Sequence, residues 1–172
     1  PTLLRLRELP IPTVAAINGV AAGVGMSLAL SCDFKVMARS AFFLQAFARI
    51  GLVPDGGSSW ILPRLIGMNR AMELSMLAER LPAEKAAEWG MITRAVDDGA
   101  VMEDAMPLAR RLADGPASLG MIRQLYWAGL ENGYADQMQL ESDLQKKAGL
   151  TKDHEEGVAA FREKRDAKFT GA

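Results

Sequence analysis

Residues 12–25 read Pro12-Thr-Val-Ala-Ala-Ile-Asn-Gly-Val-Ala-Ala-Gly-Val-Gly25 and carry the strongest structural signal in the chain. The first six residues are an apolar run that ends at Asn18-Gly19, a pattern that predicts a buried strand followed by a tight turn. The glycines that follow predict a loop over residues 22–25, and the apolar residues after them predict a short, tightly packed helix over residues 26–32. We therefore expect a strand, a glycine loop and a buried helix in immediate succession.

The same region must be tested as a membrane span, because no charged residue occurs from Ile11 to Cys32. At about 1.5 Å per residue, a helix of that length could cross a bilayer. Its composition argues against this, since Pro12, Asn18-Gly19 and several further glycines and serines interrupt it. The segment therefore predicts elements buried inside a globular domain, and we expect no membrane partner.

Beyond this region, short strands and helices alternate first and helices follow alone. Further strands are predicted over residues 33–38, 41–44 and 92–96. The helices among them are predicted over about residues 58–80 and 82–89. From residue 97 the apolar spacing is helical, with breaks at residues 115–116 and 132–133 and a last helix that runs to about residue 168. We expect an α/β part over residues 1–96 and a helical part over residues 97–172.

The composition limits the classes of function. A chain of 172 residues is about one domain, and its 49% hydrophobic residues are sufficient for a core. Lys and Arg number 20 against 21 Asp and Glu, and this balance disfavours a nucleic-acid partner. The single cysteine, Cys32, excludes an internal disulfide and is predicted to be a small core residue. The single histidine, His154, is predicted to be solvated and excludes a multi-histidine metal centre, so no metal site is expected.

The glycine loop has a structural interpretation, a turn between strand and helix, and a functional one, a binding site for negative charge. It lacks the Gly-Lys-Ser/Thr ending of a phosphate loop, and Leu28 stands where a dinucleotide fingerprint needs its third glycine. Backbone amides that hold an oxyanion, such as an enolate oxygen, remain compatible with the loop. Ser27 does not lie in the Gly-x-Ser-x-Gly motif of a hydrolase nucleophile, because Ala29 stands at the position of the second glycine. Ser27 is therefore predicted to pack in the core.

The second candidate is Asp55 in the sequence Pro54-Asp-Gly-Gly57. Pro-Asp-Gly-Gly is a strong turn signal, and most aspartates in such a setting only shape the turn. Three apolar residues, Leu52, Val53 and Trp60, lie close to Asp55 in the sequence. Apolar surroundings destabilise the ionised form of a carboxyl group, so that the group can take up and release a proton during catalysis. Asp55 is therefore a candidate acid or base.

Together and in this order, these segments resemble the crotonase (enoyl-CoA hydratase/isomerase) family. The resemblance covers nearly the whole chain. It is carried by residues 12–25, Cys32-Asp33, Ile50-Gly-Leu-Val-Pro-Asp-Gly-Gly57, Leu81-Pro-Ala-Glu-Lys-Ala-Ala-Glu-Trp-Gly-Met-Ile92 and Glu156-Gly-Val-Ala-Ala-Phe-Arg-Glu-Lys-Arg165. Within the family, the chain looks most like the phenylacetate-pathway isomerase branch, which includes 1,2-epoxyphenylacetyl-CoA isomerase and Δ3,Δ2-enoyl-CoA isomerase activities.

The resemblance implies a superhelix of β-β-α turns followed by a C-terminal helical region that builds trimers, often stacked into hexamers. It also implies that the N-terminal part of the fold is missing from this chain, which opens at Pro1 rather than at a methionine. Met121, Tyr126, Trp127 and Met138 are candidates to pack against another subunit. The family binds acyl-CoA thioesters and needs no separate cofactor, because coenzyme A is part of the substrate. A cytoplasmic location is expected.

For the active site, the resemblance implies that the backbone N–H of Val24, between Gly23 and Gly25, is one of two donors to the thioester oxygen. The other donor lies in the N-terminal stretch that this chain does not contain. Hydratases carry two glutamates that position and deprotonate a water molecule, and Ser27 and Phe47 stand at those positions here. Neither side chain can act as a carboxylate base, so hydration is not expected.

The isomerase branch resembles this chain at Asp55, which becomes the expected acid and base. Candidates to line the acyl pocket are Leu52, Trp60 and Trp127. Phe161 and Lys164 match a helix that touches the CoA of a neighbouring subunit, with Lys164 at a phosphate. The expected activity is an isomerase that shifts a double bond, or opens a ring epoxide, of an enoyl-CoA thioester through an enolate. A non-catalytic acyl-CoA-binding or assembly subunit is the alternative, and RNA binding, known in one corner of the family, is a distant third.

Overall fold

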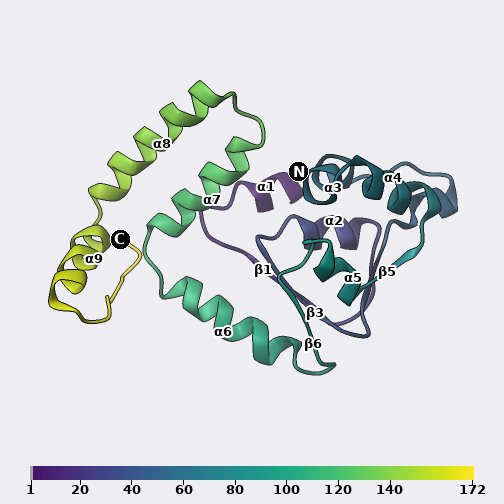
Figure 1. The fold of residues 1–172 in the computed structure, drawn as a ribbon, viewed down its shortest axis with the longest axis horizontal. Coiled ribbons are helices and arrows are strands. Elements are labelled where there is room, and N and C mark those ends of the chain that lie inside the picture. Colours follow the sequence, from purple (N-terminus) through teal and green to yellow (C-terminus); the bar gives the residue numbers. More distant parts are fainter. Residues whose placement is uncertain (1) are drawn as a thin grey trace. The chain divides into compact units, whose positions relative to one another are not determined.

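A computed structural model describes residues 2–172 of the protein, which form two compact units (Figure 1). The first unit comprises residues 2–7 and 13–108, and the second comprises residues 8–12 and 109–172. The division falls inside helix α6 (Val101–Ala113). Short strands occur only in the first unit among the described residues, and the second is helical.

The strands of the first unit form two three-stranded sheets. The parallel sheet has the order β1 (Val14–Ile17), β3 (Phe34–Ala38), β6 (Arg94–Val96). The second sheet has the order β2 (Ala21–Ala22), β4 (Phe42–Leu44), β5 (Arg80–Pro82), with β2 parallel and β5 antiparallel to β4. The central strand β3 is apolar and buried along most of its length, as expected for a strand covered on both faces.

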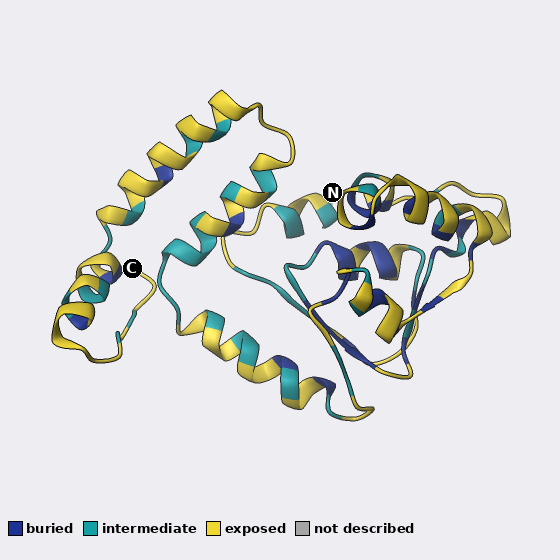
Figure 2. Ribbon diagram, in the orientation of Figure 1, coloured by how far each residue is buried: buried dark blue, intermediate teal, exposed yellow. Residues whose placement is uncertain are grey.

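The predicted strand is confirmed as β1, and the predicted buried helix is confirmed as α2 (Val24–Leu30) (Figure 2). The loop predicted over residues 22–25 is reduced to Gly23, because Ala22 ends β2 and Val24 begins α2. Helix α2 buries Met26, Ser27, Ala29 and Leu30. The helical elements are α1 (Thr2–Arg7), α2 (Val24–Leu30), the 3-10 helix η1 (Ala46–Ile50), α3 (Ser58–Ile66), α4 (Met68–Leu77) and α5 (Ala83–Glu88), with α6 at the end of the unit.

Three predictions differ from the structure for local reasons. The helix predicted through residue 80 ends at Leu77, because Ala78 adopts a left-handed conformation. The Ala78 carbonyl accepts hydrogen bonds from the Arg49 guanidinium, and β5 follows in place of the predicted last turn. The predicted helix over residues 26–32 begins earlier, at Val24. Since this helix ends at Leu30, Cys32 lies in the turn before β3 and is half-exposed, so its assignment to the core is wrong.

The second unit is built from α7 (Ser118–Gly129), α8 (Tyr134–Gly149) and α9 (Lys152–Glu163), and the breaks predicted at residues 115–116 and 132–133 are confirmed. The last helix ends at Glu163 and not at about residue 168, because Lys164 adopts a left-handed conformation. The segment 8–12 lies against α7, where Arg123 donates to the Leu9 carbonyl at 2.7 Å. Gly120 allows this approach, because a Cβ there would lie 1.9 Å from the Pro10 carbonyl oxygen. Within residues 2–172, no helix has both the length and the apolar character to cross a membrane.

Candidate active site

The glycine loop joins β2 to α2 in the first unit. Gly23 has φ 53° and ψ −123°, a conformation that suits glycine, and its N–H donates to the Leu44 carbonyl on β4 at 2.9 Å. Val24 is the first residue of α2, so its N–H has no hydrogen-bond partner within the helix. Backbone amides at a helix start favour negative charge, which is the property that an oxyanion donor needs.

Ser27 connects this loop to the loop of Asp55. Its side chain is 0% exposed, and its hydroxyl lies 3.3 Å from the Gly23 carbonyl oxygen and 3.0 Å from the Asp55 carbonyl oxygen. A serine hydroxyl carries one proton, so it donates to these two carbonyls in turn or shares the proton between them. The predicted packing role of Ser27 is confirmed by its burial, and the hydroxyl additionally holds the two candidate catalytic loops together.

The backbone of Asp55 is fixed from a second side by Ser58. The Asp55 carbonyl accepts hydrogen bonds from the Ser58 hydroxyl at 2.9 Å and from the Ser58 N–H at 3.2 Å. The next residue, Gly56, has φ 61° and packs so tightly that a Cβ there would lie 2.8 Å from the Ser27 Cβ. The Asp55 side chain therefore starts from a backbone that buried hydroxyls hold in place.

The apolar surroundings expected for Asp55 are not found among the described residues. Its side chain is exposed, and Leu52 and Val53 are 58% and 79% exposed. Gly51 ends η1 in a left-handed conformation, and the Leu52 N–H returns to the Phe47 carbonyl, so the chain leaves the core before it reaches Asp55. Asp55 is thus open to a substrate.

Two further residues that the sequence analysis singled out, Phe47 and Trp60, also lie in the first unit. The Phe47 ring is buried and lies 3.5 Å from the point where a Gly23 Cβ would stand, so a phenyl ring fills the space next to the glycine loop. Trp60 is half-buried, and the guanidinium groups of Arg64 and Arg7 lie 4.0 and 4.7 Å from its ring centroid. This stacking, which was not predicted from the sequence, joins α1 to α3.

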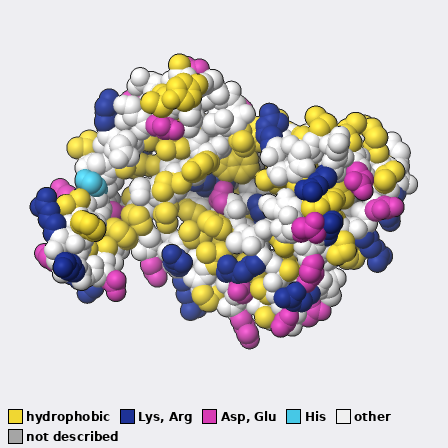
Figure 3. All heavy atoms as spheres, in the orientation of Figure 1, with side chains coloured by type: hydrophobic (Ala, Val, Ile, Leu, Met, Phe, Trp, Pro, Cys, Tyr) yellow, Lys and Arg dark blue, Asp and Glu magenta, His cyan; other side chains and the backbone are white. Residues whose placement is uncertain are grey.

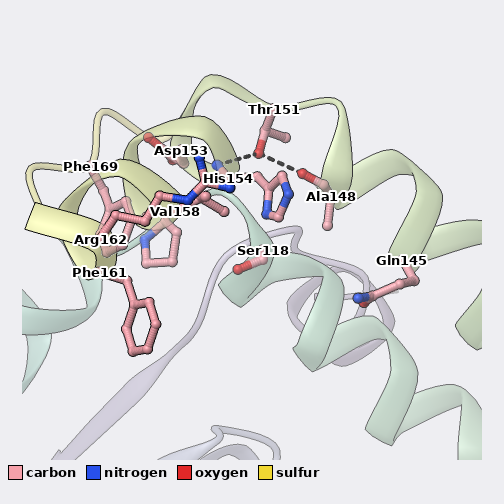
Figure 4. A pocket seen from close by; sticks show the side chains of 12 residues that line it. Ser118, Gln145, Ala148, Thr151, Asp153, His154, Val158, Phe161, Arg162 and Phe169 are labelled. Carbon is pink, nitrogen blue, oxygen red and sulfur yellow. Dashed lines mark hydrogen bonds between the residues drawn. The ribbon is translucent and has the colours of Figure 1, made fainter.

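Phe161 and Lys164 belong to the second unit. Phe161 is 85% exposed near the end of α9, and Lys164 is the exposed residue that terminates this helix. A cavity of about 500 Å³ lies in this unit, and its lining includes Phe161, Phe169 and the cationic Arg162 (Figure 4). His154, which is exposed as predicted, lies beside Thr151 in the same lining.

The chain that follows α9 is tied back to the helix by carboxylates. Glu156 accepts hydrogen bonds from the Arg165 guanidinium at 2.6 and 2.9 Å and from the Lys168 N–H at 2.8 Å. Asp153 is buried and accepts hydrogen bonds from the N–H groups of Thr170 and Gly171. We refer to residues 164–172 as the tail.

Acid is expected to loosen the tail. The hydrogen bonds from Arg165 and from the Lys168 N–H lower the pKa of Glu156 from 4.5 to about 2. A lowered pKa in the folded state means that the contribution of this carboxylate is complete above about pH 4.5 and is lost as the pH falls toward 2. The NMR shift of the Lys168 amide proton should titrate with a midpoint near 2, and the step should vanish in Glu156→Gln. A midpoint near 4.5 would contradict the ion pair.

Comparison with known proteins identifies the family to which the chain is similar. The model of the family described as enoyl-CoA hydratase/isomerase matches residues 1–172. The 1,2-epoxyphenylacetyl-CoA isomerase of Escherichia coli K12 is 48% identical over 99% of this chain, which covers 66% of that relative. The trans-2-decenoyl-(acyl-carrier-protein) isomerase of Streptococcus mutans is 36% identical over 96% of this chain, which covers 64% of that relative. The chain thus spans about two thirds of the length of these relatives.

Solved structures of enoyl-CoA hydratases show the same fold as this chain. The enoyl-CoA hydratase of Bacillus anthracis is 32% identical to this chain and superposes on it with a TM-score of 0.94. The superposition includes 99% of this chain and 67% of the hydratase chain. The enoyl-CoA hydratase of Polaromonas superposes with a TM-score of 0.93 at 34% identity, and 98% of this chain covers 66% of that one. The crotonase fold predicted from the sequence is therefore confirmed, and the chain belongs to the enoyl-CoA hydratase/isomerase family.

Proposed function

We propose that the complete protein is an acyl-CoA isomerase that shifts a double bond, or opens a ring epoxide, of an enoyl-CoA thioester. The observation that carries the proposal is the Ser27 hydroxyl, which lies within hydrogen-bond distance of the carbonyls of both Gly23 and Asp55. It joins the loop with the candidate oxyanion donor to the loop with the candidate base. The isomerases of Escherichia coli and Streptococcus mutans, to which the chain is similar, support the same reaction class.

In the proposed mechanism, the Val24 N–H donates to the thioester oxygen as negative charge develops there. One such donor is typically worth about 2.7–4 kcal/mol in the transition state. Stabilisation of the developing enolate makes the α-proton removable by a carboxylate. Asp55 takes this proton, which leaves the dienolate, and returns it further along the acyl chain. One base suffices, because substrate and product share the same dienolate. Hydration would also need a positioned water, and Ser27 and Phe47 supply no carboxylate for it.

The test is a panel of 3-enoyl-, 2-enoyl- and ring-epoxide CoA esters, assayed with the full-length protein in deuterated water. We expect a double-bond shift, with deuterium at the carbon that receives the proton, or rearrangement of the epoxide. Remaining 3-enoyl substrate should exchange its α-proton for deuterium. Rapid hydration of crotonyl-CoA would contradict the interpretation of Ser27 and Phe47. Binding of the esters without any proton exchange would instead favour the non-catalytic acyl-CoA-binding subunit.

The second unit is proposed to assemble with further copies of the chain into a trimer or hexamer in the cytoplasm. Large apolar side chains are exposed on α7 and α8, with Tyr126 78% and Tyr134 84% exposed and Met138 about half exposed. Apolar atoms are prominent on the surface of this unit (Figure 3). Aromatic residues and methionine are enriched at protein interfaces, which supports the assignment of Tyr126 and Met138 to a subunit contact.

A further inference from the structure

Helix α9 ends in a lysine with an unusual backbone conformation. Lys164 has φ 55° and ψ 41°, in the left-handed region that glycine usually occupies at helix ends. A residue with a side chain is held in that region only when neighbouring contacts determine it. The contacts that fix this turn therefore also fix the direction in which the Lys164 side chain departs from the helix.

The N–H groups of Lys164 and Arg165 close this turn by donating to backbone carbonyls of α9. Glu156, two turns earlier on α9, adds side-chain contacts to it. Its two carboxylate oxygens pair with the two terminal nitrogens of Arg165, the residue directly after Lys164, at 2.6 and 2.9 Å. A bidentate pair of this kind defines the orientation of both groups. The same carboxylate accepts the Lys168 N–H at 2.8 Å, so it binds the tail at two points just beyond the turn. The Arg165 Nε also donates to Glu163, at 2.6 Å.

We propose that Glu156 is a positioning residue for the CoA part of the substrate. Through Arg165 it holds the turn at Lys164, and so it presents the Lys164 ammonium and the neighbouring Phe161 ring to the nucleotide end of CoA. This inference rests on the proposed function and on the expectation, from the family resemblance, that Lys164 meets a phosphate of CoA. A lysine at a helix end can also act only by stabilising the helix dipole, and the experiment below distinguishes the two roles.

The tail has a second anchor, which makes a clean test possible. Asp153 accepts hydrogen bonds from the N–H groups of Thr170 and Gly171 at 2.8 and 3.0 Å, independently of Glu156. It also accepts the Ala117 N–H at the start of α7, at 2.8 Å. A change at Glu156 therefore releases the turn at Lys164 while the end of the tail stays attached, and we expect the variant to fold.

The experiment compares Glu156→Gln with Glu155→Gln in the full-length protein. Glu155 is the exposed neighbour on the same helix, so its substitution removes the same charge without touching Arg165. KM and kcat are measured for an enoyl-CoA ester and for the corresponding pantetheine thioester, which lacks the nucleotide phosphates. Glu156→Gln should raise KM for the CoA ester about tenfold, with kcat and the pantetheine KM unchanged. Glu155→Gln should leave all values as in the wild type.

Two further measurements distinguish a failure of the positioning role from a failure of the proposed function. Lys164→Gln should reproduce the CoA-specific rise in KM, and the double variant with Glu156→Gln should show no additional rise, because both changes remove the same contact. A rise of equal size for both thioesters, or no rise for either, would overturn the positioning role. If the wild type turns over neither thioester, the proposed function fails. Calorimetric binding of CoA to the same variants then tests Glu156 alone, and equal affinities would overturn its role.

Discussion

Asp55→Asn is expected to reduce isomerase turnover of the full-length protein by about 10²–10⁴-fold, the usual contribution of a positioned acid–base group. The amide is nearly isosteric with the carboxylate but cannot accept the α-proton at neutral pH. The fold should be unaffected, because Ser27 and Ser58 bind the Asp55 backbone carbonyl, which the substitution leaves in place. The measurement is kcat for a 3-enoyl-CoA ester, together with the rate of deuterium exchange at the α-carbon.

A matched control is Asp114→Asn, which removes the same charge from an exposed aspartate in the second unit. This variant should keep wild-type turnover and wild-type thermal stability. Loss of activity in both variants would indicate an effect of net charge and not of position. Turnover at the wild-type rate in a folded Asp55→Asn protein would remove Asp55 from the mechanism and favour a binding subunit.

The sequence predicted the elements of the fold best where hydrophobic pattern and turn chemistry agree. The apolar run before Asn18-Gly19 became β1, and the breaks at residues 115–116 and 132–133 separate α6, α7 and α8. It failed at β5, which is only three residues long and begins at Arg80, two residues after Ala78. A left-handed alanine stabilised by Arg49 from a distant element is a tertiary effect, and local propensity carries no signal for it.

The candidate site shows the same division between local and distant causes. The glycine pattern predicted a loop before a buried helix, but it was equally compatible with a plain turn, and only the family resemblance assigned the oxyanion donor to Val24. The bridge from Ser27 to Asp55 crosses 28 positions, and nothing in the local sequence of a buried serine indicates which carbonyl it binds. The ion pair between Glu156 and Arg165 spans nine positions, a spacing that joins them only because the left-handed turn at Lys164 reverses the chain.

Gly56→Ala is expected to combine a loss of stability with a loss of activity. Gly56 has φ 61°, where a side chain costs about 1–2 kcal/mol, and its Cβ would lie 2.8 Å from the Ser27 Cβ. Because that atom is attached to the backbone of α2, it cannot move aside, and overpacking adds about 1–3 kcal/mol. Relief of the clash would shift the Asp55 loop away from α2. Since a shift of about 1 Å can reduce a rate about 10²-fold, turnover should fall even in the molecules that remain folded.

Gly57→Ala separates the two causes, because Gly57 also has a left-handed backbone, with φ 81°, but no atom lies within 4 Å of its Cβ position. Chemical denaturation should show a loss of about 1–2 kcal/mol for Gly57→Ala, from the backbone alone. Gly56→Ala should lose roughly 2–5 kcal/mol, the sum of backbone strain and overpacking. Equal losses in the two variants would mean that the contact between Gly56 and Ser27 is not tight. The coupling of the two catalytic loops through Ser27 would then lose its main steric support.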